Sequence, residues 1–143
     1  MAKTACPNPA AIQRRSVIAI DTSALMAIVL GEPEADACID ALGMEAEVLI
    51  SAGTVAEALI VAARRNVGEE MIKLIDGFGF EIVAVTPASA RRIAVAYERW
   101  GNGVHKAGLN FGDCFAYEIA KNHSCRLLFV GRDFSGTDLA SVL

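Results

Sequence analysis

Four carboxylate residues are the strongest candidates for chemistry in this 143-residue chain: Asp21, Glu57, Asp113 and Asp133. No cluster of histidine or cysteine accompanies them. Carboxylate oxygens without such softer ligands suit a hard cation, Mg²⁺ or Mn²⁺. One or two such ions can activate a water molecule and stabilise a leaving oxygen, which is the chemistry of phosphodiester hydrolysis. In that chemistry Glu57 or Asp133 would orient or deprotonate the water.

Glu57 is the carboxylate that a purely structural role explains least well. It is the only charged residue in the segment VAEALIVAA at 55–63. A helix that is apolar nearly all round is expected to be buried, and a buried lone carboxylate is costly unless it is paired or bound to a cation. No lysine or arginine lies three or four positions from Glu57. An arginine from elsewhere in the fold is the remaining structural explanation.

The three aspartates also have ordinary structural explanations. Asp21 can cap a helix, Asp113 can interact with a helix dipole, and Asp133 can be a turn residue. Each explanation concerns one residue alone. The metal hypothesis therefore depends on all four carboxylates meeting in one place.

The elements that must position these residues alternate between short strands and helices. Strands are predicted at 17–20, 48–50, 81–85 and 127–130, and helices at 24–30, 33–42, 52–65, 66–76, 87–100 and 111–122. This alternation predicts an α/β fold of three layers, with a short, mostly parallel central sheet flanked by helices. Ligands of such folds bind beyond the carboxyl ends of the strands, where the next helices begin. We therefore expect the four carboxylates to share that edge.

Length and composition indicate one globular domain. The chain is 54% hydrophobic and 21% charged, which excludes a disordered polypeptide. No apolar run approaches the roughly 20 residues that cross a bilayer. Residues 1–16 lack the apolar segment of a secretory signal. We expect a flexible N-terminal extension over 1–16, a domain over 17–143, no membrane association and a cytoplasmic location.

Cysteine spacing and net charge exclude some further classes. The four cysteines form no C-x-x-C pair and are interpreted as packing residues: Cys6, Cys38, Cys114 and Cys125. The net charge of −4 argues against indiscriminate binding of nucleic acid through phosphates alone. Candidate phosphate contacts are Arg64, Arg65, Arg91, Arg92, Arg99, Lys106 and Arg132, although the two adjacent pairs are expected on solvent-facing helix surfaces.

Four parts of the chain resemble the PIN-domain ribonucleases, and most closely the VapC-type toxins of bacterial toxin–antitoxin pairs. They are IAIDTSAL at 18–25, the isolated Glu57, LNFGDCFAY at 109–117 and DFSGTD at 133–138. The resemblance extends from about Val17 to Val142. It implies a PIN domain and an endoribonuclease that depends on Mg²⁺ or Mn²⁺ and acts on RNA. It also implies a homodimer that a VapB-like antitoxin binds and inhibits.

The resemblance also implies roles for individual residues. Asp21 and Asp113 would bind the metal directly, while Glu57 and Asp133 would complete the site, partly through water. Thr22 or Ser23 would hydrogen-bond a ligand or water there. The chain departs from the family pattern at Arg132, which could pair with Asp133 or contact a phosphate.

Two other functions stay open at this stage. One is a different metal-dependent phosphoesterase, and the other is a catalytically silent PIN-like interaction domain. Retention of all four acids argues against the silent domain. Apolar residues of the first two predicted helices are candidates for a dimer face or an antitoxin groove, among them Leu25, Met26, Val29 and Leu30.

Overall fold

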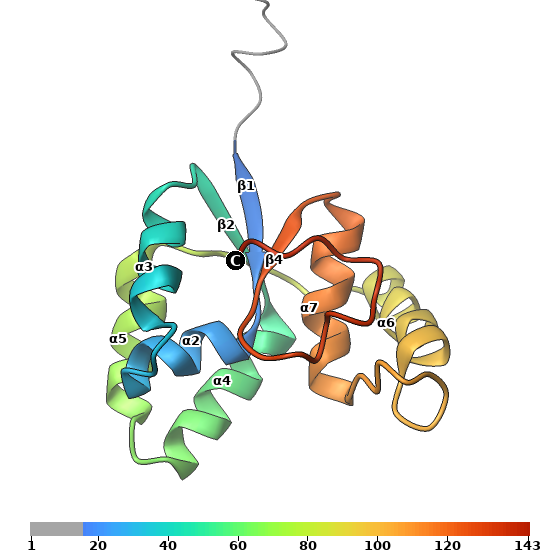
Figure 1. Cartoon of the computed structure of the whole chain (residues 1–143), viewed down its shortest axis with the longest axis horizontal. Helices are drawn as coiled ribbons and strands as arrows, with labels where there is room; N and C mark the ends of the chain where they lie inside the picture. Colours follow the sequence, from blue (N-terminus) through green and yellow to red (C-terminus); the bar gives the residue numbers. More distant parts are fainter. Residues whose placement is uncertain (1–15) are drawn as a thin grey trace, which may run out of the picture.

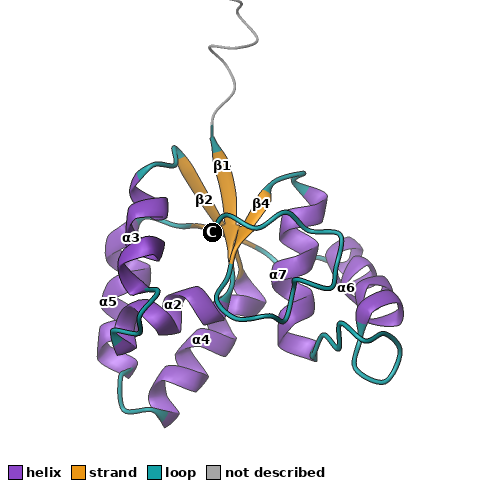
Figure 2. Cartoon of the chain, viewed as in Figure 1, coloured by secondary structure: helices purple, strands orange, loops and turns teal. Residues whose placement is uncertain are grey.

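The computed structural model describes residues 16–143, which form a sheet of four parallel strands covered by helices (Figure 2). The strands are β1 (Val17–Ile20), β2 (Glu47–Ser51), β3 (Glu81–Val83) and β4 (Arg126–Leu128). Their spatial order is β3-β2-β1-β4, and every neighbouring pair is parallel. The predicted α/β class and parallel sheet are confirmed.

The helices divide between the two faces of the sheet (Figure 1). One group consists of α2 (Thr22–Leu30), α3 (Ala35–Gly43), α4 (Ala52–Arg64) and α5 (Gly68–Phe78). The other consists of α6 (Pro87–Trp100) and α7 (Phe111–Asn122). This arrangement confirms the three predicted layers. No helix within residues 16–143 has the length and apolar character needed to span a membrane.

The alternation of side chains along each strand divides the core into two clusters. Ile18 and Ile20 of β1 pack into the cluster formed with α2 to α5. Ala19, between them, belongs to the cluster formed with α6 and α7. Leu25 and Met26 lie inside the first cluster at 0% and 7% exposure. Leu25 and Met26 therefore do not reach the described surface, whereas Val29 and Leu30 of the same helix are half-buried, so a dimer face or antitoxin groove on this helix stays a prediction.

Several predicted boundaries are confirmed by their caps. Asp21 caps the start of α2 at Thr22, two residues before the predicted start, and Gly31 ends the helix as predicted, in the left-handed conformation with φ of 64°. Ser51 caps α4, and Asn110 caps α7. The bounds of α6 and α7 are those predicted.

Other elements begin or end a few residues from their predicted limits. Helix α5 begins at Gly68 because Asn66 has φ of 59°, which a right-handed helix does not accommodate. Helix α3 begins at Ala35, two residues after Pro33. Strand β4 ends at Leu128 because the Val130 N–H turns away to the Ser23 hydroxyl, 3.0 Å distant.

The C-terminal segment lies along β4. The Leu127 N–H donates to the carbonyl of Ala140 at 3.0 Å, and the Val142 N–H donates to the carbonyl of Leu127 at 3.1 Å. The predicted N-terminal extension, except Ser16, lies outside the described residues. Ser16 precedes β1, and its carbonyl accepts a hydrogen bond from Glu47 N–H at 3.2 Å.

Candidate functional site

Asp21 lies at the carboxyl end of β1 and is almost fully buried, at 3% exposure. Its Oδ2 accepts hydrogen bonds from the Ser23 N–H at 3.0 Å and the Ser23 hydroxyl at 2.7 Å. Its Oδ1 is buried and has no hydrogen-bond partner among the described residues. A buried polar atom without a partner is costly, so this oxygen is available to a ligand from outside the chain.

Glu57 lies in the first half of α4 and is half-buried. Its Oε1 accepts a hydrogen bond from the Thr22 hydroxyl at 2.6 Å, which connects α4 to the start of α2. Its Oε2 lies against Gly112 in the first turn of α7. These contacts place Glu57 between the helix starts that carry Asp21 and Asp113.

The prediction that α4 is buried nearly all round is wrong. Only Thr54, Ala58 and Ala62 of this helix are buried, and Ile60 is 56% exposed. Helix α4 covers one face of the sheet and leaves its opposite side uncovered. No ion pair to Glu57 occurs within residues 16–143, so the arginine considered from the sequence is not found there.

Asp113 lies in the first turn of α7 and is 7% exposed. Its Oδ2 accepts from the Asn110 N–H at 2.9 Å, and its own N–H donates to Asn110 Oδ1 at 2.8 Å. The two residues thus form a capping box that fixes the helix start. Asp21 and Asp113 therefore have the structural roles that the sequence allowed, and these roles also hold their side chains in place.

The acidity of the two buried aspartates shows that the carboxylates influence one another. The pKa of Asp113 is raised to about 7, mainly by burial, and the charges of Asp21, Asp133 and Glu57 contribute to the rise. Burial likewise raises the pKa of Asp21 to about 6, with a contribution from the charge of Glu57, although the Ser23 hydrogen bonds oppose the shift. A cation at this edge would favour the charged form of both carboxylates and so oppose these shifts.

Asp133 follows β4 in an exposed loop. Its charge raises the pKa of Asp113, but no hydrogen bond joins its side chain to the other three carboxylates in residues 16–143. No ion pair between Asp133 and Arg132 occurs in the same residues. Asp133 therefore lies at the rim, whereas Asp21, Glu57 and Asp113 lie on neighbouring helices.

The fit of these residues to a metal ion follows from their chemistry. Within residues 16–143 no three His, Cys, Asp or Glu side chains already surround one point as an ion cage would require. Mg²⁺ commonly takes only one or two carboxylates and keeps several waters, so such a cage is not a precondition. The oxygen donors and the unpartnered Asp21 Oδ1 fit a hard divalent cation.

Three residues near the carboxylates have roles that the sequence interpretation did not assign. Thr22 bonds Glu57, and Ser23 connects Asp21 to Val130, so neither hydroxyl is reserved for a ligand. Gly112 provides the space for Glu57. The signal for Gly112 was available in its position directly before Asp113, at the start of a helix where glycine is otherwise unfavourable.

The cysteines are separate from the site chemistry. Cys38 and Cys114 are fully buried free thiols, and Cys125 is a half-buried free thiol. Burial raises the pKa of each. This confirms the packing interpretation for these three, while Cys6 lies outside the described residues.

Comparison with known proteins identifies the family. The sequence profile described as "PIN domain" matches residues 18–139, nearly the whole described chain. The chain belongs to the PIN-domain family.

This PIN domain is 40% identical over 126 residues to Ribonuclease VapC30 of Mycobacterium tuberculosis, covering 86% of this chain and 96% of that protein. It is 39% identical over 126 residues to Ribonuclease VapC of Mycolicibacterium smegmatis, covering 86% and 98%. Within the family it therefore groups with the VapC ribonucleases, which as PIN-domain enzymes are in general dependent on divalent metal ions.

Solved structures show the same PIN fold. The structure of VapC20 of Mycobacterium tuberculosis, described as a sarcin-ricin loop cleaving toxin, superposes with a TM-score of 0.71 at 15% identity, covering 86% of this chain and 96% of that one. VapBC-5 of the same species, described as a member of a family of toxin–antitoxin systems, gives a TM-score of 0.60 at 17% identity, covering 89% and 94%. At these identities the likeness concerns the fold.

Proposed function

We propose that this chain is the toxin of a VapBC-like toxin–antitoxin pair. In this proposal it is an endoribonuclease, and the site that hydrolyses RNA is formed by Asp21, Glu57, Asp113 and Asp133. The observation that carries the proposal is the pair of buried aspartates at neighbouring helix starts, one of which has an unpartnered oxygen. The relatives named ribonucleases, at about 40% identity over most of the chain, support RNA as the substrate.

In this proposal Asp21 and Asp113 hold the cation, which is Mg²⁺ or Mn²⁺. When bound, the ion supplies an activated water and stabilises the leaving oxygen. Ser23 fixes the Asp21 carboxylate, and Asn110 fixes that of Asp113. Glu57 keeps Oε2 toward α7 and is the group placed to orient or deprotonate the attacking water. Asp133 contributes negative charge from the rim.

A VapB-like antitoxin and a second copy of the chain are the proposed partners. A cavity of about 330 Å³ lies between α4 and α7 beside Glu57, and its lining includes the exposed side chains of Ile60 and Phe111. A partner that covers this apolar surface would also cover Glu57, which offers a route to inhibition. The structural relatives described as toxin–antitoxin complexes support this assignment. A cytoplasmic location stays a prediction.

Cleavage assays with the metal varied provide the direct test. The purified chain should cut single-stranded RNA with Mg²⁺ or Mn²⁺ and stop in excess chelator. Asp21→Asn and Asp113→Asn should abolish cleavage while retaining a cooperative thermal transition, and Asp76→Asn on the exposed face of α5 should leave cleavage unchanged. Cleavage by either site variant at the wild-type rate would exclude the proposed metal ligands.

A substrate panel separates the two alternatives. A general phosphoesterase would hydrolyse DNA or small phosphate esters as readily as RNA. A silent interaction domain would cut none of them while still binding a partner. The proposal requires preference for RNA.

A further inference from the structure

A groove with a cationic rim lies between α6 and α7, away from the four carboxylates. Its volume is about 300 Å³. Val95, Ala96 and Trp100 of α6 provide an apolar floor, and Val95 is 59% exposed. The cations that line it are Arg91, Arg92, Arg99 and Lys121.

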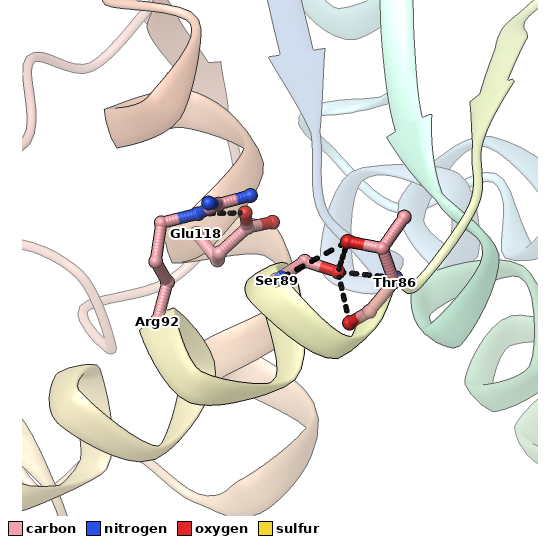
Figure 3. A network of polar contacts seen from close by, with 4 residues as sticks. All are labelled: Thr86, Ser89, Arg92 and Glu118. Atoms are coloured by element: carbon pink, nitrogen blue, oxygen red, sulfur yellow. Dashed lines mark hydrogen bonds and ion pairs between the residues drawn. The ribbon is translucent and has the colours of Figure 1, made fainter.

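Two of these cations are neutralised by the chain itself. Arg92 Nε lies 2.8 Å from Glu118 Oε1, and Lys121 Nζ lies 3.0 Å from Asp138 Oδ2 (Figure 3 shows the first pair). Arg91 and Arg99 have no ion-pair partner within residues 16–143. The groove therefore carries excess positive charge on a chain whose net charge is −4.

The walls of the groove are fixed before any ligand arrives. Thr86 and Ser89 form a capping box that begins α6, and one turn later Arg92 reaches across to Glu118, whose side chain is 2% exposed (Figure 3). At the other end the Trp100 Nε1–H donates to the Tyr117 hydroxyl at 2.9 Å. A preorganised site loses less conformational entropy on binding.

The combination of cations and apolar floor fits single-stranded nucleic acid. Phosphates contact the rim of such sites, and bases pack on aromatic or apolar side chains in any sequence. The Arg99 guanidinium already lies 4.7 Å from the centre of the Trp100 ring, which leaves a flat cationic surface at one end.

The position of the groove relates it to the carboxylate site. Helix α7 carries Asp113 in its first turn, and two turns later it carries Lys121 in the groove. Eight residues of helix separate them, about 12 Å along the axis. A strand with its scissile bond at Asp113 can therefore continue along α7 for a few nucleotides.

We propose that the groove between α6 and α7 binds the single-stranded RNA that flanks the scissile bond. Arg91 and Arg99 contact phosphates, and a base packs over Val95, the exposed apolar side chain of the floor. The inference rests on the proposed ribonuclease function and adds to it a second contact surface. The groove thereby increases the affinity of the protein for long RNA substrates, whereas the carboxylates act on the scissile phosphodiester bond.

Binding measured without cleavage tests the groove separately from the catalytic site. The probe is a fluorescein-labelled single-stranded RNA 20-mer, titrated in chelator and followed by anisotropy. The double variant Arg91→Gln/Arg99→Gln should bind at least about tenfold more weakly. The slope of log K against log salt should fall by about 1.4, the value for two lost contacts on a single strand.

The matched control is Arg64→Gln/Arg65→Gln, which removes the same charge from exposed residues at the end of α4. It should change the affinity less than twofold. An equal loss of RNA affinity in both double variants would mean that the arginines act only through general electrostatic attraction, and it would overturn the proposal. Displacement of the RNA by poly-glutamate of equal charge would also overturn it, since it would indicate a site for acidic protein.

The two proposals fail in distinguishable ways. If the wild-type chain binds RNA through the groove but cuts none with Mg²⁺ or Mn²⁺, the ribonuclease function fails and the groove assignment stands. If it cuts RNA while the groove variants bind and cut the 20-mer like wild type, the groove assignment alone fails. Thermal melting of each variant verifies that it is folded.

Discussion

Gly112 of α7 lies directly against Glu57 Oε2 of α4, with no space between them for a side chain. The Thr22 hydroxyl holds the other oxygen of Glu57 at 2.6 Å. Glu57 is thus held between α2 and α7, the two helices whose starts carry the buried aspartates. The carboxylate geometry therefore depends on a glycine that has no functional group.

Gly112→Ala should reduce RNA cleavage at least about tenfold, because the added methyl group displaces the Glu57 carboxylate. The cost in stability should be small, since the displaced atoms are the end of a flexible side chain. Initial rates at saturating Mn²⁺, together with a thermal melt, measure the two effects.

Gly77→Ala provides the control for the methyl group itself. Gly77 lies within α5 and has no atom within 4 Å of an added Cβ. Alanine there should leave cleavage unchanged and stabilise the fold by about 0.5–1 kcal/mol. Wild-type activity in a folded Gly112→Ala protein would mean that catalysis tolerates a displaced Glu57.

Without metal, the stability of the chain should fall as pH rises from about 4 to about 7. The pKa of Asp113 in the folded state is about 7, and that of Asp21 is about 6, both above their ordinary value of 3.8. The folded state therefore holds protons that the unfolded state has released, and the free energy of unfolding decreases through this range. Urea titrations in chelator at several pH values measure the decrease.

Asp113→Asn should remove much of that dependence. The variant should be more stable than wild type at pH 8, by on the order of 1–2 kcal/mol, and nearly equal to it at pH 4. Asp76→Asn, on the exposed side of α5, should follow the wild-type curve. If the free energy of unfolding falls as steeply with pH in Asp113→Asn as in the wild type, the decrease arises from other titratable groups.

Mg²⁺ or Mn²⁺ should raise the melting temperature at pH 8, because the ion binds the folded carboxylates and has no comparable site in the unfolded chain. At about 100 times the dissociation constant the expected gain is about 2.7 kcal/mol, or roughly 5–10 °C for a domain of this size. At pH 5, where Asp21 and Asp113 hold protons, the gain should shrink. Sodium chloride at matched ionic strength is the control, and an equal gain in an Asp21→Asn/Asp113→Asn protein would refute the assigned ligands.

Ser23→Ala should weaken both the fold and the site. The Ser23 hydroxyl donates to Asp21 at 2.7 Å and accepts from the Val130 N–H at 3.0 Å, so its removal leaves that N–H without its partner. We expect a loss of about 1–3 kcal/mol in unfolding free energy. The pKa of Asp21 should rise further because the hydroxyl lowers it, which moves the acid limb of the cleavage profile to higher pH. Ser141→Ala, at an exposed hydroxyl, should change neither.

Local sequence signals account for most of the fold. Caps such as Asp21, Ser51 and Asn110 act through neighbouring residues, so their helices could be located from the sequence. The ends of the strands could not be located from the sequence, because they depend on hydrogen-bond partners that are far away along the chain. β3 ends at Val83 since its partner β2 ends at Ser51, where α4 begins. Val130 leaves β4 because of Ser23, which is remote in sequence.

For the candidate site, the residue types in the sequence indicated which side chains to consider, but the sequence did not predict which of them are buried or exposed. The isolated Glu57 lies between the starts of α2 and α7, and its role in the site stays a proposal. The inference that its helix is buried all round is wrong, because an apolar side of α4 faces outward. The groove on α6 and α7 was equally hidden. Arg91 and Arg92 are both exposed, as expected for a helix surface, but the sequence does not reveal that Arg92 forms an ion pair with Glu118 while Arg91 has no such partner within residues 16–143.

The C-terminal residues 140–142 occupy the outer edge of β4. Open sheet edges invite strands of other molecules to add to them and so start aggregation. At this edge the chain's own tail takes that place, and at the opposite edge β3 spans only Glu81–Val83 and begins with a charged side chain. The sheet thus offers little template for growth between molecules, which leaves the surfaces of the helices and loops for association with other chains.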